Sequence, residues 1–90
     1  MESDFLGAIA LYPNPTQNNS TLSFVLNQSE NIQVSILDVQ GRVVNLLADL
    51  NLSSGKHEVE IPSGNLQSGI YFVQLSSGNK ATHIKLVVTH

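Results

Sequence analysis

The chain of 90 residues contains no cysteine and no tryptophan, and only 12% of its residues are charged. The absence of cysteine excludes disulfides and thiolate metal sites as sources of stability. No apolar run approaches the roughly 20 residues of a membrane-spanning helix. Four scattered basic residues and a net charge of −3 provide no positive stripe for phosphates, so we expect no nucleic-acid partner. What remains is one small domain whose polar surface comes mainly from Asn, Ser, Gln and Thr, a composition that suits an extracellular β-protein.

The first residues differ from the rest of the chain. MESDFLGAIA is acidic and too weakly apolar for a secretory signal peptide. We therefore predict that residues 1–8 are a linker or an expression remnant and that residues 9–90 form the folded domain. If the natural protein is exported, its signal is expected to lie outside this sequence.

Alternation of apolar and polar residues dominates the remainder of the chain. Apolar side chains recur at every second position from Leu22 to Leu26, and again from Ile84 to Val88. One buried and one solvated face is typical of antiparallel strands, and turn residues separate these stretches every 8–12 residues or so, as in sandwiches and barrels. We expect an all-β fold, an antiparallel Ig-like β-sandwich of about seven strands. The expected strands are 9–12, 20–26, 31–38, 42–47, 56–61, 69–76 and 81–88.

Four apolar residues in the middle of the chain are ambiguous. They have helical spacing and are Val43, Leu46, Leu47 and Leu50. However, the β-branched pair Val43-Val44 follows directly on a turn and favours a strand. We expect this strand to be followed by a turn near Ala48-Asp49.

Two further segments have distinctive local chemistry. In the turn Val39-Gln40-Gly41-Arg42, Gly41 should supply a positive φ and Asp38 should accept backbone N–H groups. In Tyr12-Pro13-Asn14-Pro15, each proline biases its predecessor toward extended conformations and cannot donate to a ladder. This segment is therefore expected to be an edge or an approach that sets how the chain enters the sandwich.

No catalytic or metal-binding constellation emerges from the sequence. The candidate acids are Asp38, Asp49, Glu58 and Glu60, and the histidines are His57, His83 and His90. Glu58 and Glu60 alternate with apolar residues and should lie on a solvated face, and the histidines lack metal-site spacing. No nucleophile motif and no phosphate loop occurs. We expect no catalytic, cofactor or metal residues and a function in recognition rather than in enzymatic catalysis.

Aromatic residues are few, and they bear on the main alternative function. Phe24 and Tyr71 have core positions in the pattern, whereas Phe72 lies on the opposite face from Tyr71. We expect Phe72 to be a core residue covering the second sheet, with a surface anchor as the alternative. An extracellular adhesion or carbohydrate-binding module would use exposed aromatics of this kind.

Four segments in this order resemble a known family. They are LYPNP with Tyr12, Pro13, Asn14 and Pro15; DVQGRVV with Asp38, Gly41 and Arg42; NLQSGIYFVQL with Leu66, Gly69 and Tyr71; and HIKLVV with Lys85, Leu86, Val87 and Val88. Together they make residues 9–89 similar to the type IX secretion C-terminal sorting domain (type A; Por secretion C-terminal domain).

The resemblance implies a signal carried at the C-terminus of a larger cargo. The cargo would reach the periplasm, the outer-membrane translocon and shuttle would recognise the folded sandwich, and a sortase would cleave ahead of it. The product would be secreted or held at the cell surface, either released or anchored to lipopolysaccharide. In this interpretation YPNP is a rigid joint between a cleavable linker and the sandwich.

The resemblance also implies roles for single residues. Gly41 and Arg42 would form the family's hairpin turn, Gly69 and Tyr71 its GxY strand, and Lys85, Val87 and Val88 its terminal stretch, where recognition concentrates. Many members finish on a lysine, whereas this sequence finishes on Thr89-His90.

The open edges of a sandwich carry unpaired backbone groups. THIKLVV has one lysine in seven residues and is therefore weakly protected. We expect a partner or a second copy to add a strand at the last or the first strand, with some tendency to form an edge-strand homodimer.

Overall fold

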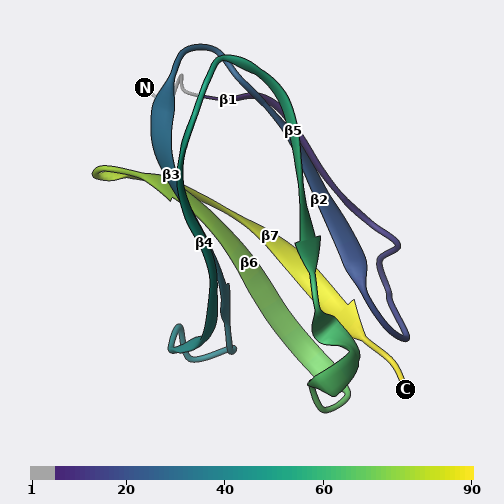
Figure 1. The fold of residues 1–90 in the computed structure, drawn as a ribbon. Helices are drawn as coiled ribbons and strands as arrows, with labels where there is room; N and C mark the ends of the chain where they lie inside the picture. Colours follow the sequence, from purple (N-terminus) through teal and green to yellow (C-terminus); the bar gives the residue numbers. More distant parts are fainter. Residues whose placement is uncertain (1–5) are drawn as a thin grey trace.

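Residues 6–90 of the chain are described by a computed structural model and form seven strands (Figure 1). The strands are β1 Leu6–Tyr12, β2 Ser20–Leu26, β3 Glu30–Leu37, β4 Val43–Leu52, β5 Gly55–Ile61, β6 Gly69–Ser77 and β7 Lys80–Val88. A short 3-10 helix, η1 Ser63–Asn65, precedes β6. Within these residues no helix is long and apolar enough to span a membrane.

The strands form two antiparallel sheets that pack face to face (Figure 1). One sheet has the order β1-β2-β5 and the other the order β4-β3-β6-β7, which confirms the expected Ig-like sandwich. All strands except β4 lie within a few residues of their expected bounds. Residues 1–5 of the expected linker lie outside the described residues, and Leu6–Ala8 form the first part of β1.

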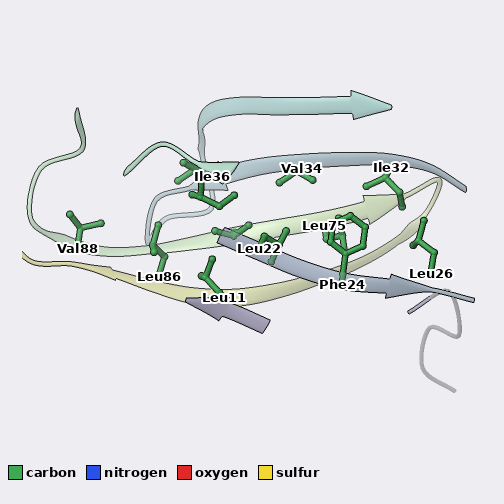
Figure 2. Packing of buried hydrophobic residues seen from close by; sticks show 12 residues of the cluster. Leu11, Leu22, Phe24, Leu26, Ile32, Val34, Ile36, Leu75, Leu86 and Val88 are labelled. Carbon is green, nitrogen blue, oxygen red and sulfur yellow. The ribbon is translucent and has the colours of Figure 1, made fainter. Parts of the chain in front are cut away.

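The core lies between the sheets and comes from the alternation seen in the sequence. Leu22 and Phe24 on β2 face Val34 and Ile36 on β3, and all four side chains are at most 1% exposed (Figure 2). Figure 2 places Leu26 and Ile32 at one end of this core and Leu86 and Val88 at the other. Burying each such side chain stabilises the fold by roughly 1.5–3 kcal/mol relative to leaving it exposed.

Strand β4 differs from the expectation. It runs without a break from Val43 to Leu52, so the expected end near Leu47 and the turn at Ala48-Asp49 are wrong. Two register shifts against β3 leave Val44 and Leu47 as extra residues in β-bulges. Each bulge shifts the alternation of inward and outward side chains by one position. The apolar residues of β4 therefore have the spacing expected of a helix.

A polar cluster ties the start of β3 to the β6–β7 hairpin. The Glu30 carboxylate accepts hydrogen bonds from Ser77 Oγ over 2.6 Å, from Gln28 Nε2 over 3.1 Å and from Lys80 Nζ over 3.2 Å. The Glu30 side chain is only 11% exposed. The hydrogen bonds, that of Ser77 foremost, lower the pKa of Glu30 from 4.5 to about 2.

This cluster predicts a specific acid sensitivity. Because the folded-state pKa of Glu30 lies below the unfolded value, its stabilisation is complete above pH 4.5 and is lost as the pH falls toward 2. We expect Glu30→Gln to be less stable than the wild type at pH 7 but to lose less stability between pH 7 and about pH 3. Urea midpoints of both proteins at the two pH values measure this. Equal acid losses in the two proteins would show that Glu30 is not the responsible group.

Candidate functional site at the YPNP segment and the last strand

Residues 12–16, which we call the strap, leave the end of β1 and lie along the edge of β7. Figure 1 shows the β1–β2 connection reaching the C-terminal end of β7. The peptide bonds Tyr12–Pro13 and Asn14–Pro15 are both cis. Thr16 pairs in parallel with Val88, so the strap joins the three-stranded sheet to the edge of the four-stranded sheet.

The side-chain amide of Asn14 takes the place of a neighbouring strand. Asn14 Nδ2 donates to Lys85 O over 2.6 Å, and Val87 N donates to Asn14 Oδ1 over 3.0 Å. An amide side chain offers a donor and an acceptor, the same pair that a peptide unit offers. The prolines on either side have no N–H to donate, and the Asn14 side chain supplies both the donor and the acceptor at this point of the edge.

Thr16 continues the pairing with its backbone. Thr16 N donates to Val87 O over 2.9 Å, and Thr89 N donates to Thr16 O over 2.8 Å. The Thr16 hydroxyl donates to Asn19 O and accepts from Asn18 N, both over 3.1 Å, and the residue is only 2% exposed. The strap therefore pairs the edge of β7 from Lys85 to Thr89 and ends in a hydrogen-bonded turn.

Side chains from β2 and β5 hold the strap from the other side. Ser20 Oγ donates to Pro13 O over 2.8 Å, and Tyr12 Oη donates to Glu58 Oε2 over 3.2 Å. Glu60 likewise accepts from Asn19 Nδ2 over 2.9 Å. Both glutamates are exposed, on the solvated face where the sequence pattern placed them, and both bind the segment that precedes β2.

His90 closes the same end of the molecule. Its backbone N donates to Ser68 Oγ over 3.1 Å. Its ring nitrogens lie 2.6 Å from Leu66 O and 3.1 Å from Gln17 O. The residues after β7 thus pack back onto the β5–β6 connection and the turn that follows the strap.

The β3–β4 turn has the chemistry expected from the sequence. Asp38 Oδ1 accepts from Gln40 N and Arg42 N, each over 2.9 Å, and Asp38 Oδ2 accepts from Arg42 Nε over 3.1 Å. These bonds, that of Arg42 N foremost, lower the pKa of the Asp38 carboxyl. Gly41 has a φ of 87°, and its N–H donates to Asp38 O.

The chain matches a known protein family. The family model of the secretion system C-terminal sorting domain matches residues 10–89, nearly the whole chain. The chain belongs to the type IX secretion C-terminal sorting domains. As a sorting domain it directs export by type IX secretion to the cell surface or beyond, and it works in the context of a cargo and the secretion machinery. No curated protein matches it.

Among the predicted residues of this sorting domain, the structure brings the strap into direct contact with β7. Gly69 and Tyr71 pair with the other edge of β7, opposite Val88 and Leu86. Tyr71 Oη donates to Gln67 O over 2.7 Å while its ring packs on the core. The hydrogen bonds of Asp38 and Arg42 stay within their own turn.

The terminal stretch divides its side chains between two faces. Val88 lies in the core and is 1% exposed, whereas Lys85 and Val87 point to the outer face of the four-stranded sheet. The expectation that Phe72 belongs to the core is wrong. Phe72 is partly exposed on that outer face, beside Lys85, because it alternates with the core residue Val73.

Sequence reasoning missed four polar residues of this site: Thr16, Ser20, Ser63 and His90. Ser63 is fully buried and donates to Asn18 O. A polar residue between strand and turn carries no periodic signal, so only the tertiary pairing identifies it. Asn14 did carry a signal, since its side-chain amide offers both a donor and an acceptor between two prolines that have no N–H.

Within residues 6–90, no three His, Cys, Asp or Glu side chains gather as a metal site. His57 Nε2 lies 2.7 Å from Ser53 O, and His83 Nε2 lies 3.1 Å from Gln74 Oε1. Asp49 accepts a hydrogen bond from Gln33 Nε2 across the strand pair. Each of these polar groups has a local structural partner.

Gly41 provides a test of the hairpin turn. A Cβ at this position would meet no neighbouring atom, so the cost of Gly41→Ala comes from its positive φ alone. We expect Gly41→Ala to lower the free energy of unfolding by about 1–2 kcal/mol. Gly41→Asn should lower it less, because asparagine tolerates the left-handed region. Urea denaturation compares the two, and equal losses would contradict a conformational cause.

Proposed function

We propose that this domain is a folded signal on the C-terminal side of a cargo, read by the type IX translocon and shuttle and removed by sortase cleavage ahead of β1. The observation that supports this proposal is the pairing of the strap with β7. It hydrogen-bonds the segment after β1 to the backbone of the last strand, so the beginning and the end of the domain form one unit. Because β1 is paired with β2 from Leu6 onward, cleavage ahead of β1 would leave the paired strands intact.

The cargo would follow the periplasmic route and cross the outer membrane, ending either released or anchored to lipopolysaccharide. The domain itself would perform no catalysis. Its paired carboxylates support this, since Glu58 and Glu60 lie on an exposed sheet face and each accepts a hydrogen bond from the segment before β2.

An export assay tests the sorting function. Residues 1–90 are fused behind a fluorescent protein with a periplasmic signal, in a host with type IX secretion. We expect fluorescence in the medium or on the cell surface, and loss of the domain from the exported protein. If the fusion stays in the periplasm while an established sorting domain exports the same reporter, the proposal fails.

The alternative of a carbohydrate-binding or adhesion module has one supporting observation. Phe72 lies partly exposed on a sheet face beside a hollow lined by Leu37, Val39 and His83. Glycan-array binding that disappears in Phe72→Ala would favour this function. Tyr12 is also exposed, but its hydroxyl is held by Glu58 and it lies at the strap instead.

Edge-strand self-pairing remains a prediction. The strap occupies β7 from Lys85 to Thr89, so on the two strands where we expect pairing, a second copy would add to β7 between Lys80 and Ile84 or to the edge of β1. We expect weak, concentration-dependent dimers in size exclusion with light scattering. A monomer at every concentration would contradict this.

A further inference from the structure

The outer face of the four-stranded sheet is polar near one end of the molecule and apolar near the other. Asn31 and Gln33 point outward at the polar end, and both are exposed. Toward the β3–β4 turn the outward residues become apolar. We call these residues the outer patch: Leu37, Val43, Leu46, Ile70, Phe72 and Val87.

The register of the strands makes the outer patch continuous. Leu37 pairs with Val43 on one side and with Phe72 on the other, and Phe72 pairs with Lys85, so one row crosses all four strands. Ile70 pairs with Val87 in the adjoining row. Directly paired side chains on one face have Cβ atoms about 4.5–5.5 Å apart.

The outer patch lies on the opposite side of the sheet from the core. None of its six residues belongs to the contiguous core cluster between the sheets or packs against it. Leu37 is nevertheless buried, at 7% exposed, beneath the other residues of the patch. Val43 is 63% exposed, Leu46 58% and Ile70 46%. Beside them Val39 and Phe72 line the hollow at the β3–β4 turn. Contiguous exposed apolar surface of this kind marks interaction sites on soluble domains.

A cation also borders the patch. Lys85 is the last residue of the row that contains Leu37 and Phe72. It is exposed and makes no ion pair within the described residues. Arg42 lies next to Val43, but its guanidinium is paired with the Asp38 carboxylate within the β3–β4 turn. Glu58 and Glu60 lie on the other sheet. The chain is acidic as a whole, yet it presents Lys85, a cation without an ion pair among the described residues, beside this apolar surface.

The patch also lies away from where a cargo joins the domain. Leu6 pairs with Leu26, which Figure 2 places beside Ile32, at the opposite end of the core from Leu86 and Val88. The outer patch lies at the Leu86 and Val88 end, because Tyr71 between Ile70 and Phe72 pairs with Leu86. A cargo that precedes β1 therefore leaves the patch open.

We propose that the outer patch is the surface on which a protein of the export machinery docks, through aliphatic or aromatic side chains flanked by a carboxylate that pairs with Lys85. The proposal rests on the sorting function proposed for the domain. A second copy fits less well: a symmetric dimer through this patch would bring Lys85 of both copies to one interface, and Lys85 has no ion-pair partner among the described residues. The two bulges also disrupt β4 as an edge for strand addition.

Leu46 and Leu50 provide a matched test. Both lie on β4 and are similarly exposed, at 58% and 49%. Leu46 pairs with Ser35 and points outward, whereas Leu50 pairs with the core residue Ile32 and points to the other face. The reporter fusion is compared as wild type, Leu46→Glu, Ile70→Glu and Leu50→Glu, with thermal unfolding of each isolated domain.

We expect Leu46→Glu and Ile70→Glu to lower the exported fraction about 10-fold or more, as the loss of a central interface residue does, with folding retained. Leu50→Glu should stay within about twofold of the wild type, and Lys85→Glu should lose export while Lys85→Arg keeps it. Export of Leu46→Glu and Ile70→Glu at wild-type level would overturn the proposal, as would equal loss in folded Leu50→Glu.

Two further measurements separate other occupants. Binding of the domain to anionic phospholipid vesicles that Leu46→Glu abolishes would assign the patch to a membrane, and a dimer that Leu46→Glu dissociates would assign it to a second copy; either result overturns the proposal. A wild-type fusion that is not exported refutes the sorting function itself and the docking surface with it. A wild-type fusion that is exported while the patch variants are also exported refutes the docking surface alone.

Discussion

Leu86→Ala is expected to lower the free energy of unfolding by about 2–5 kcal/mol, the range for removing a fully buried leucine from a core. Leu86 is 0% exposed and lies on the inner face of β7, near the end where the strap closes the sandwich. A domain of this size is stable by only about 5–13 kcal/mol, so this one change removes a large share of its stability. Urea denaturation at neutral pH measures the loss.

Leu46→Ala is the matched control, because it makes the same chemical change at a side chain that is 58% exposed. We expect it to alter stability by no more than about 0.5 kcal/mol. Similar losses in both variants would mean that the core is not where the structure places it. The pair also tests how the signal is read: if the machinery recognises the folded sandwich, Leu86→Ala should lose export above its unfolding temperature, and continued export there would indicate a linear signal.

The regular strands were predictable because each has one buried and one solvated face. In β2, burial alternates at every residue from Ser20 to Leu26, and the polar pattern follows it. Strand β4 was not predictable in the same way, because the bulges at Val44 and Leu47 break the period. Their positions depend on pairing with β3, which local sequence does not determine.

Strand β6 shows a second limit of prediction from sequence, which is the choice of the buried face. Alternation correctly separated Tyr71 from Phe72, and Tyr71 does pack on the core. Which face of β6 meets the second sheet depends on how the whole sandwich packs. In this structure the face with Phe72 points away from the core. An apolar residue facing outward looks the same in sequence as one facing inward, so the outer patch required the register of four strands.

The strap was predictable in its local behaviour but not in its partner. The prolines showed that residues 13–15 could not form a central strand, and the structure places them beside the edge strand β7. The partner lies 71 to 73 positions away, at Lys85 and Val87. Only the closed topology of the two sheets brings these residues together.

Asn14→Ala is expected to lower the free energy of unfolding by about 1–3 kcal/mol, because it removes two hydrogen bonds and a typical bond contributes about 0.5–1.5 kcal/mol. It leaves Lys85 O and Val87 N without their partner in the strap. The amide of Val87 should exchange with solvent faster than in the wild type, since local opening no longer has to break that bond. Asn51→Ala is the control: it removes one exposed bond to Asn31 and should change stability by less than about 0.5 kcal/mol.

Asn14→Asp separates the two bonds of this side chain. A carboxylate can still accept from Val87 N, but it cannot donate to Lys85 O and instead directs negative charge at that carbonyl oxygen. We therefore expect Val87 to keep more of its exchange protection than in Asn14→Ala, although stability falls at least as far. Unchanged protection of Val87 in both variants would mean that Thr16, and not Asn14, holds the strap against β7, and Asn14 would then have no part in joining the first strand to the last.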